Sequence, residues 1–214
     1  MWTPDGVTAD TLYLVLATFL LAGMVKGVIG MALPTVSLGV LAATLGLKEA
    51  IVLMLVPSFL TNVWQGLAGG HFAALMRRLW LLLAAMAAGT WFGTAALRMP
   101  DTSILELILG GTLVAYGAFG LRTPHFPAAG GREPWLSPLI GAATGVLAGL
   151  TGSTVLPVVP YLQTLGLSRE ALIQAMGICF SAAALAIGLA LGGRSLLPAD
   201  LGLMSVIGVL PALV

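Results

Sequence analysis

The sequence predicts an all-α polytopic membrane protein with about eight or nine apolar helical segments. Of its 214 residues, 59% are hydrophobic and 8% are charged, whereas a soluble domain carries about 25% charged residues. Apolar runs of about 16 to 22 residues recur along the chain, and each suits a crossing of about 30 Å of hydrocarbon. Strands of a membrane barrel would be about ten residues long and would alternate polar with apolar side chains, which these runs do not.

Short polar breaks separate the expected helices. In chain order they cover about 11–29, 31–45, 50–69, 79–97 and 104–121, and then 135–150, 154–165, 171–192 and 199–214. The stretch between the two groups, 122–134, is the longest polar one, and its Pro and Gly content suits neither helix nor strand. The segments at 31–45 and 154–165 are short for a full crossing, so a pair of broken or re-entrant helices is expected.

A weak internal repeat relates the two halves of the chain. Three glycines return at a constant offset of 122 residues: Gly23, Gly27 and Gly30 match Gly145, Gly149 and Gly152. The motif that follows, a proline and then LGLKEA, is echoed by a proline and then LGLSREA. Five segments separate the starts of the halves, and an odd number of crossings inverts the second copy in the membrane. Inverted repeats are typical of secondary transporters.

The repeat divides the chain into a first transmembrane repeat, 1–121, a polar linker, 122–134, and a second repeat, 135–214. The second repeat has no counterpart of 104–121, so we expect either a shortened chain or a last helix that was never duplicated. Basic residues flank the segments unequally: Arg77, Arg78, Arg122, Arg132 and Arg169 fall on one side, and Lys48, Arg98 and Arg194 on the other. The positive-inside rule places the first set in the cytoplasm and the N-terminus outside.

Two glycine-proline elements, 25–34 and 148–157, are the sharpest local feature. In each, a glycine ends one apolar segment and a proline begins the next, which is the usual punctuation for a helix stop and a helix start. Free backbone N–H groups at a helix start favour an anion without any side chain. The candidate substrate-binding residues are Lys26, Gly27, Gly30, Met31 and Pro34 in the first element, and Gly149, Thr151, Gly152, Ser153, Thr154 and Pro157 in the second.

Lys26 is the only charged residue between Thr11 and Leu47. A charge near the bilayer centre costs about 3 kcal/mol, and such residues are functional by default. An alternative is that the side chain extends to the interface or caps a helix end. For the glycines, close helix contact is an equally open interpretation, which Gly141, Gly145 and Gly149 at a spacing of four also suggest.

The third segment carries a polar stripe, because Ser58, Thr61, Asn62 and Gln65 recur at helical spacing. The matching helix of the second half offers Gln174, Cys179 and Ser181. Polar side chains facing lipid are disfavoured, so each stripe should face the bundle interior. Asn62, Gln65 and Ser181 are therefore candidate lining residues of a substrate pathway, with hydrogen bonding between helices as the alternative.

The sequence lacks the residue patterns expected for nucleic-acid binding, metal binding or catalysis. The net charge of +1 indicates no nucleic-acid partner. His71 and His125 have no carboxylate or cysteine at ligand spacing, so neither a metal site nor another cofactor is expected. No Ser/His/Asp set and no pair of intramembrane acids is found, and no catalytic residue is assigned. The expected partners are a small anion and the lipid bilayer, and the oligomeric state stays open.

The glycine-proline elements, each followed by an LGL turn and a polar-striped helix, together with Gly89 and Gly93, resemble the sulfite exporter TauE/SafE family. The resemblance extends from about 14 to 214. It implies a multi-pass transporter of the cell inner membrane, with sulfite, sulfoacetate or another small organosulfur or organic anion as substrate. Two departures leave the substrate open: Met31 and Ser153 interrupt the family's longer glycine runs, and Val56-Pro57-Ser58 and Gly177-Ile178-Cys179 stand where Gly-Thr-Ser is usual.

The sequence thus predicts a secondary transporter of small anions that is not an enzyme. A non-transporting membrane partner or assembly factor in sulfur metabolism is the alternative, and a channel is a third possibility. The direction of transport and the coupling ion stay open.

Overall fold

In the computed structural model, the described residues, 9–30, 33–122 and 127–213, form helices and no strand. The all-α prediction is therefore confirmed. The α-helices are α1 (Ala9–Ile29), α2 (Leu33–Leu45), α3 (Leu47–Leu67), α4 (Phe72–Gly93), α5 (Ser103–Arg122), α6 (Glu133–Thr151), α7 (Val158–Gln163), α8 (Arg169–Gly192), α9 (Ala199–Ile207) and α10 (Val209–Ala212). Short 3-10 turns, η1 (Thr94–Arg98) and η2 (Gly130–Arg132), extend α4 and precede α6.

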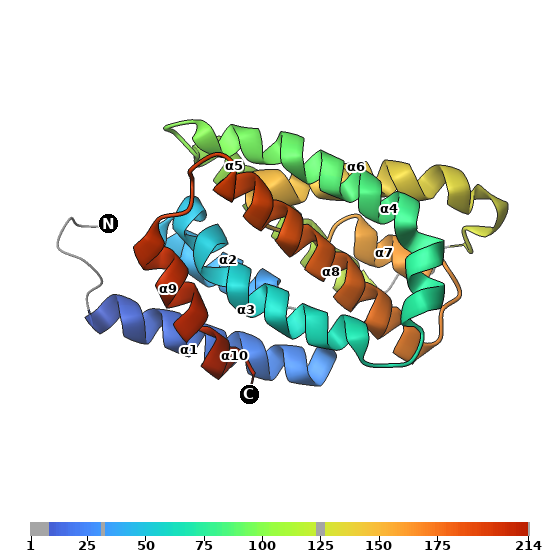
Figure 1. Cartoon of the computed structure of the whole chain (residues 1–214), viewed down its shortest axis with the longest axis horizontal. Coiled ribbons are helices and arrows are strands. Elements are labelled where there is room, and N and C mark those ends of the chain that lie inside the picture. Colours follow the sequence, from blue (N-terminus) through green and yellow to red (C-terminus); the bar gives the residue numbers. More distant parts are fainter. Residues whose placement is uncertain (1–8, 31–32, 123–126, 214) are drawn as a thin grey trace.

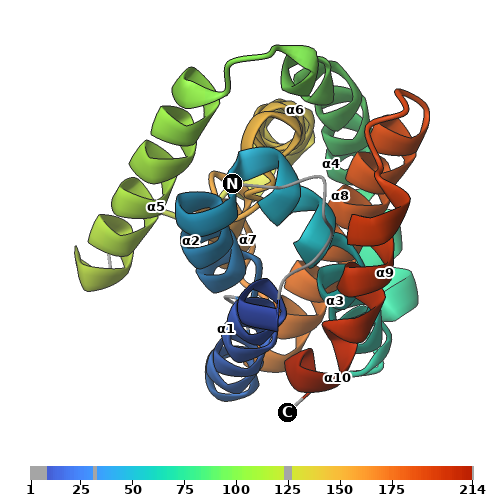
Figure 2. The ribbon, with the colours of Figure 1, turned by 90° about the vertical axis from the view of Figure 1, so that its left-hand side faces the viewer.

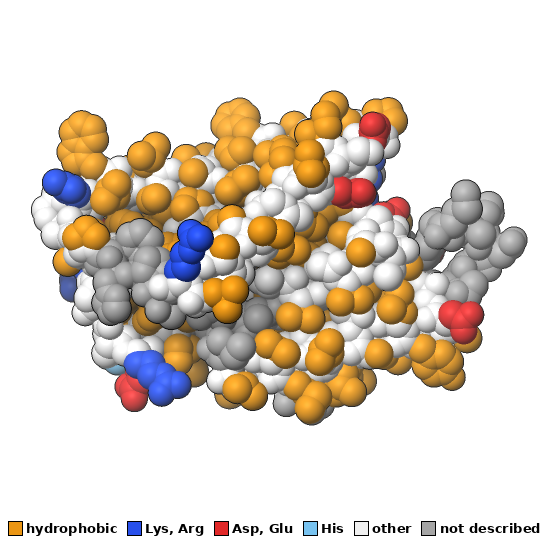
Figure 3. Space-filling view, turned by 180° about the vertical axis from the view of Figure 1, so that it is seen from behind, with side chains coloured by type: hydrophobic (Ala, Val, Ile, Leu, Met, Phe, Trp, Pro, Cys, Tyr) orange, Lys and Arg blue, Asp and Glu red, His pale blue; other side chains and the backbone are white. Residues whose placement is uncertain are grey.

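Six of these helices, α1, α3, α4, α5, α6 and α8, are long and apolar enough to cross a membrane. Two shorter apolar stretches, α2 and the pair α9 and α10, flank them. A polytopic membrane fold is therefore supported by length and composition, with fewer full crossings than the nine apolar segments of the sequence. Figure 3 agrees, because a broad apolar surface separates one end, where most Lys and Arg side chains lie, from the other, where most acids lie.

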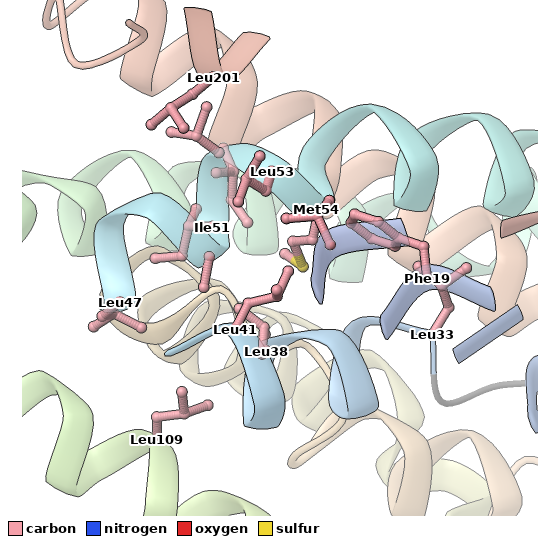
Figure 4. Close-up of a cluster of buried hydrophobic side chains, with 14 of the residues drawn as sticks. Phe19, Leu33, Leu38, Leu41, Leu47, Ile51, Leu53, Met54, Leu109 and Leu201 are labelled. Carbon is pink, nitrogen blue, oxygen red and sulfur yellow. The ribbon is translucent and has the colours of Figure 1, made fainter. Parts of the chain in front are cut away.

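Two helix pairs form the centre of the molecule: α3 packs against α8, and α4 against α6 (Figure 1). Helix α1 lies along one edge with α2 and α10 beside it. Helix α5 stands apart on the side away from α8 and α9, and its main contacts are with α2 and α6 (Figure 2). Between α1, α2 and α3 lies a closed apolar core in which Ile51 and Met54 face Leu38 and Leu41 (Figure 4).

Glycines allow the central pairs to pack backbone against backbone. A Cβ on Gly145 of α6 would lie 2.1 Å from the carbonyl oxygen of Met86 on α4. A Cβ on Gly177 of α8 would lie 2.5 Å from the backbone nitrogen of Gly66 on α3. Small residues at helix contacts are the usual way in which membrane helices approach closely. The close-contact interpretation is therefore confirmed for Gly141, Gly145 and Gly149 of α6, whereas the Cβ position of Gly27 has no atom within 4 Å.

Two expected boundaries differ from the structure. Helix α4 begins at Phe72, not near 79, because Arg77 and Arg78 are accommodated in its first turns with exposed side chains. The second short helix, α7, covers Val158–Gln163 only, whereas the apolar pattern predicted 154–165. Residues 153–157 are not helical, since Pro157 cannot donate a backbone hydrogen bond and stands at the N-cap instead.

Candidate functional site

The ammonium group of Lys26 reaches from the last turn of α1 to the polar stripe of α3. It donates a hydrogen bond of 3.0 Å to Thr61 Oγ1 and another to Asn62 Oδ1. Lys26 is half-buried, whereas Thr61 and Asn62 are buried. The side chain therefore neither caps its own helix end nor extends freely to the surface, because it is bound across the interface between two helices.

Helix α3 presents these acceptors through its own internal bonds. Asn62 donates from Nδ2 to Ser58 Oγ at 3.1 Å, and Thr61 donates from Oγ1 to the Pro57 carbonyl oxygen at 2.8 Å. Pro57 lies inside the helix and has no N–H for the Leu53 carbonyl. Ser205 of α9 donates to that carbonyl at 2.8 Å, so the interruption in α3 is satisfied from a neighbouring helix.

No carboxylate of the described residues forms an ion pair with this lysine. Within the described part of the chain, the one ion pair joins Arg78 to Glu133 at 2.7 Å, near the starts of α4 and α6. The two partners of Lys26 are a neutral hydroxyl and a neutral amide oxygen. An ammonium has three N–H donors, and two are used here. The arrangement is a cation held by neutral groups, with a third donor that has no partner among the described residues.

The rest of the polar stripe serves other contacts. Gln65 donates from Nε2 to the Ile173 carbonyl oxygen at 2.8 Å, so its amide joins α3 to α8. Gln174 returns a similar bond from Nε2 to the Gly66 carbonyl at 2.9 Å. Ser181 donates to the Gly177 carbonyl at 2.6 Å and lines an apolar groove of about 290 Å³ between α3, α4 and α8. Of the candidate lining residues, only Asn62 thus contacts Lys26.

The first glycine-proline element is described in part. Gly30 has a φ of 78° and its nitrogen bonds to the Lys26 carbonyl oxygen at 2.7 Å, which ends α1. Gly27 is exposed and has no atom within 4 Å of its Cβ position. Pro34 is buried in the first turn of α2. Met31 lies outside the described residues, so the backbone N–H groups expected to bind an anion after Gly30 do too.

The second element has a different local structure. Gly152 has a φ of 76° and ends α6, and its nitrogen bonds to the Ala148 carbonyl at 2.8 Å. Thr151 Oγ1 donates to the Leu147 carbonyl at 2.7 Å and accepts from the Ser153 nitrogen at 3.2 Å. Ser153 is 1% exposed, and its hydroxyl has no partner among the described groups. Thr154 is also buried.

The start of the second short helix differs from the one that the sequence predicted. Helix α7 has six residues and begins five positions after Ser153, so it carries little of the macrodipole of a full-length helix. Gly149 is not free to line a site either, because its Cβ position lies 2.6 Å from the Thr90 carbonyl oxygen of α4. What remains at this break is a set of buried hydroxyls, with Ser153 unpaired.

The structure brings Lys26 and Asn62 together, but no hydrogen bond between described residues joins the two glycine-proline elements. Sequence reasoning placed Ser58 and Thr61 on the polar stripe without assigning them to the site. Their helical spacing to Asn62 is the signal in the sequence. The lysine that binds Thr61 lies 35 positions away from it, and Ser58 bonds to Asn62 instead. Only the three-dimensional structure, in which the Lys26 side chain extends from the end of α1 to α3, reveals the pairing of the lysine with Thr61.

Comparison with known proteins agrees with this architecture. A family model described as Sulfite exporter TauE/SafE matches residues 15–214. Neither a curated protein nor a solved structure gives a significant match.

Proposed function

The chain belongs to the sulfite exporter TauE/SafE family, and we propose that it is a secondary transporter that moves a small anion past Lys26. The substrate is sulfite, sulfoacetate or another organosulfur or organic anion. The observation that carries the proposal is the lysine held by neutral oxygens of α3 with no described carboxylate beside it. A charge kept inside a membrane bundle at a cost of several kcal/mol favours a role in a substrate pathway.

Reciprocal contacts support two inverted repeats. Gly30 lies against Ile173, and Gly152 lies against Ile51. Gly152 lies 122 positions after Gly30, and Ile51 lies 122 positions before Ile173. The second contact is therefore the first one with the two halves exchanged. Two further contacts behave in the same way: Gly177 with Gly66 corresponds to Leu55 with Gly188, and Gly145 with Thr90 corresponds to Gly23 with Ala212. Such exchange of partners is expected when a pseudo-twofold axis relates the halves.

The direction of the axis follows from α3 and α8. Leu55 meets Gly188, near the end of α8, whereas Gly66 meets Gly177, nearer its start. The two helices therefore run antiparallel, as a twofold axis in the membrane plane requires. Thr61 on α3 and Ala183 on α8 are also 122 positions apart, and they lie midway between these two contacts. The pseudo-twofold axis therefore passes close to them. Thr61 binds Lys26, so we place the anion site at the centre, near the bilayer midplane, where transporter sites lie.

The polar groups of this site are not repeated. The positions equivalent to Lys26, Thr61 and Asn62 in the second half are Ala148, Ala183 and Ala184, and all three alanines are buried. The glycine contacts are shared by both halves, whereas the cation and its two acceptors occur in one. This contrast favours a binding role for the three polar residues, because the packing of the other half does without them.

The second half supplies hydroxyls instead. Thr151, Ser153 and Thr154 are buried at its break, and the unpaired Ser153 hydroxyl has a donor to offer. We propose that these groups bind the anion with Lys26 after the halves, 1–121 and 135–214, rock against each other across the linker 122–134. The end that carries Arg77, Arg78, Arg122, Arg132 and Arg169 faces the cytoplasm in this proposal, and the membrane is the inner one.

Anion flux into proteoliposomes tests the proposal. We expect saturable uptake of sulfite or sulfoacetate by the intact chain, loss of about tenfold or more in uptake efficiency for Lys26→Ala, and substantial retention for Lys26→Arg, because a hydrogen bond to a charged group contributes about 1.5–3 kcal/mol. Lys48→Ala is the control, since this lysine bonds to the Met99 carbonyl at a helix end. Absence of flux for every such anion would favour the alternative of a non-transporting membrane partner. Flux that does not saturate would indicate a channel.

A further inference from the structure

A second cavity lies outside the Lys26 site, in the second half of the protein. It has a volume of about 380 Å³ and lies between the end of the linker, the first turns of α6 and helix α7. Leu136, Ile140, Pro157 and Pro160 form apolar walls, and Arg132 stands at the exposed rim. Arg132 ends the short turn η2 before α6, next to Glu133, which pairs with Arg78 of α4.

The hydroxyl groups of the wall are already engaged. The Tyr161 hydroxyl and Ser137 Oγ share a hydrogen bond of 2.7 Å, and Thr164 Oγ1 donates to the Tyr161 carbonyl at 2.7 Å. A ligand in this cavity therefore meets hydrocarbon surface on most sides. Arg132 is the remaining polar side chain of the lining.

The charge of Arg132 has no counter-charge among the described side chains. Its neighbour Glu133 is bound by Arg78, whose Nε and Nη2 donate to the two carboxylate oxygens at 2.7 Å and 2.8 Å. Arg78 Nη2 also donates to the Leu165 carbonyl at 3.0 Å, which holds this pair in place. The Arg132 guanidinium has no hydrogen-bond or ion-pair partner among the described side chains, and a guanidinium binds carboxylate or sulfonate oxygens in a bidentate manner.

We propose that this cavity is an entrance site for amphipathic organic anions, a sulfonate or carboxylate on a short hydrocarbon chain. Arg132 binds the anionic group, and the walls of α6 and α7 cover the hydrocarbon. The inference rests on the proposed function and narrows its substrate class, since a bare inorganic anion gains nothing from apolar walls. Pro157 belongs both to the cavity and to the second glycine-proline element, which also contains the buried Ser153 hydroxyl.

Calorimetric titration of the full chain in detergent tests the site with methanesulfonate, butane-1-sulfonate and sulfate. Each additional buried methylene should tighten binding about fourfold, which follows from about 0.8 kcal/mol per CH₂. Butane-1-sulfonate should therefore bind tens of times more tightly than methanesulfonate, and sulfate most weakly. Affinity that does not depend on chain length would overturn the proposal.

Two substitutions locate the binding. Arg132→Gln should weaken butane-1-sulfonate by about tenfold or more, whereas Arg77→Gln, an exposed arginine at the same end, should have no effect. Ile140→Phe fills the cavity and leaves Arg132 in place. In this variant, the affinity should no longer increase with the length of the alkyl chain. Equal affinities for the intact chain and Arg132→Gln would contradict the binding of the anionic group by Arg132.

Lys26→Ala separates this site from the transport site. If the two are distinct, Lys26→Ala abolishes flux and still binds butane-1-sulfonate through Arg132. If Lys26→Ala abolishes both, the anion binds at the centre and the entrance site is wrong, although the proposed function survives. If the intact chain gives no flux but shows binding that depends on Arg132, transport is wrong and the cavity stands as an anion site.

Discussion

Asn62 donates a hydrogen bond of 3.1 Å from its side-chain nitrogen to Ser58 Oγ, one turn earlier on α3. The two ends of an amide are chemically opposite, since the nitrogen only donates and the oxygen only accepts. Because Ser58 uses the nitrogen, the oxygen of Asn62 is the end that meets the ammonium of Lys26. Ser58 is therefore a positioning residue for the lysine, although it does not contact it.

Ser58→Ala should weaken substrate binding without stopping transport. The amide of Asn62 then loses the bond that fixes its orientation, which is worth about 1 kcal/mol or roughly fivefold in affinity. We expect KM for anion uptake to rise by that factor while kcat changes little. Initial rates in proteoliposomes measure both.

The matched control is Ser37→Ala. Ser37 is also buried, and its hydroxyl donates to the Leu33 carbonyl of its own helix at 2.6 Å. An equal rise of KM in both variants would mean that Ser58 acts only through general packing.

Asn62→Asp should stop transport while the protein remains folded. A carboxylate at this position forms an ion pair with Lys26 and occupies the place of the anion, so we expect flux to fall by at least about tenfold. The mirror variant, Ala184→Asp, buries a carboxylate with no cation beside it, which costs several kcal/mol. Yield and thermal unfolding should therefore fall for Ala184→Asp only, and normal flux in Asn62→Asp would contradict the role of Lys26.

The sequence predicted the helical class and most helix positions, because the length of an apolar run is fixed by the membrane that it must cross. The predicted length of α7 is too great, because the apolar run at 154–165 includes residues that are not helical. Hydropathy alone does not distinguish the irregular stretch before Pro157 from a helix. An apolar run indicates that a segment is buried, but it does not show that the segment is helical. A proline-rich segment can be buried without forming a helix.

The candidate site was predictable as a lysine and a polar stripe, but not as one cluster. Lys26 binds Thr61 and Asn62, whereas Gln65 and Ser181 lie on the same expected stripes and bond to backbone carbonyls of α8. Helical periodicity places residues on one face, but the neighbouring helix decides which of them meet a charge. That information lies in the three-dimensional structure, where the Lys26 side chain reaches α3 from the end of α1.

Gly145→Ala should be strongly destabilising, and Gly111→Ala should not. The added Cβ at Gly145 would lie 2.1 Å from the Met86 carbonyl oxygen, so α4 and α6 must separate, at a cost of about 3 kcal/mol. The Cβ position of Gly111 on α5 has no atom within 4 Å. Replacing this helical glycine by alanine should be neutral or stabilise by up to about 1 kcal/mol. Unfolding in SDS measures both, and similar losses for the two variants would contradict close α4–α6 packing.

The two helix-ending glycines should tolerate alanine unequally. Gly30 and Gly152 both have a positive φ, which costs a non-glycine residue about 1 kcal/mol. At Gly30 the added Cβ would lie 3.7 Å from Ile173, an ordinary contact, so Gly30→Ala should lose only that amount. At Gly152 it would lie 2.9 Å from Ile51 Cγ1 and 3.2 Å from Leu38 Cδ2, inside the closed core of α2 and α3. Gly152→Ala should therefore lose about 3 kcal/mol in all, since crowding a packed core adds about 1–3 kcal/mol. Equal losses in SDS unfolding would mean that the core around Ile51 can yield, and that the break of the second half is held no more tightly than that of the first.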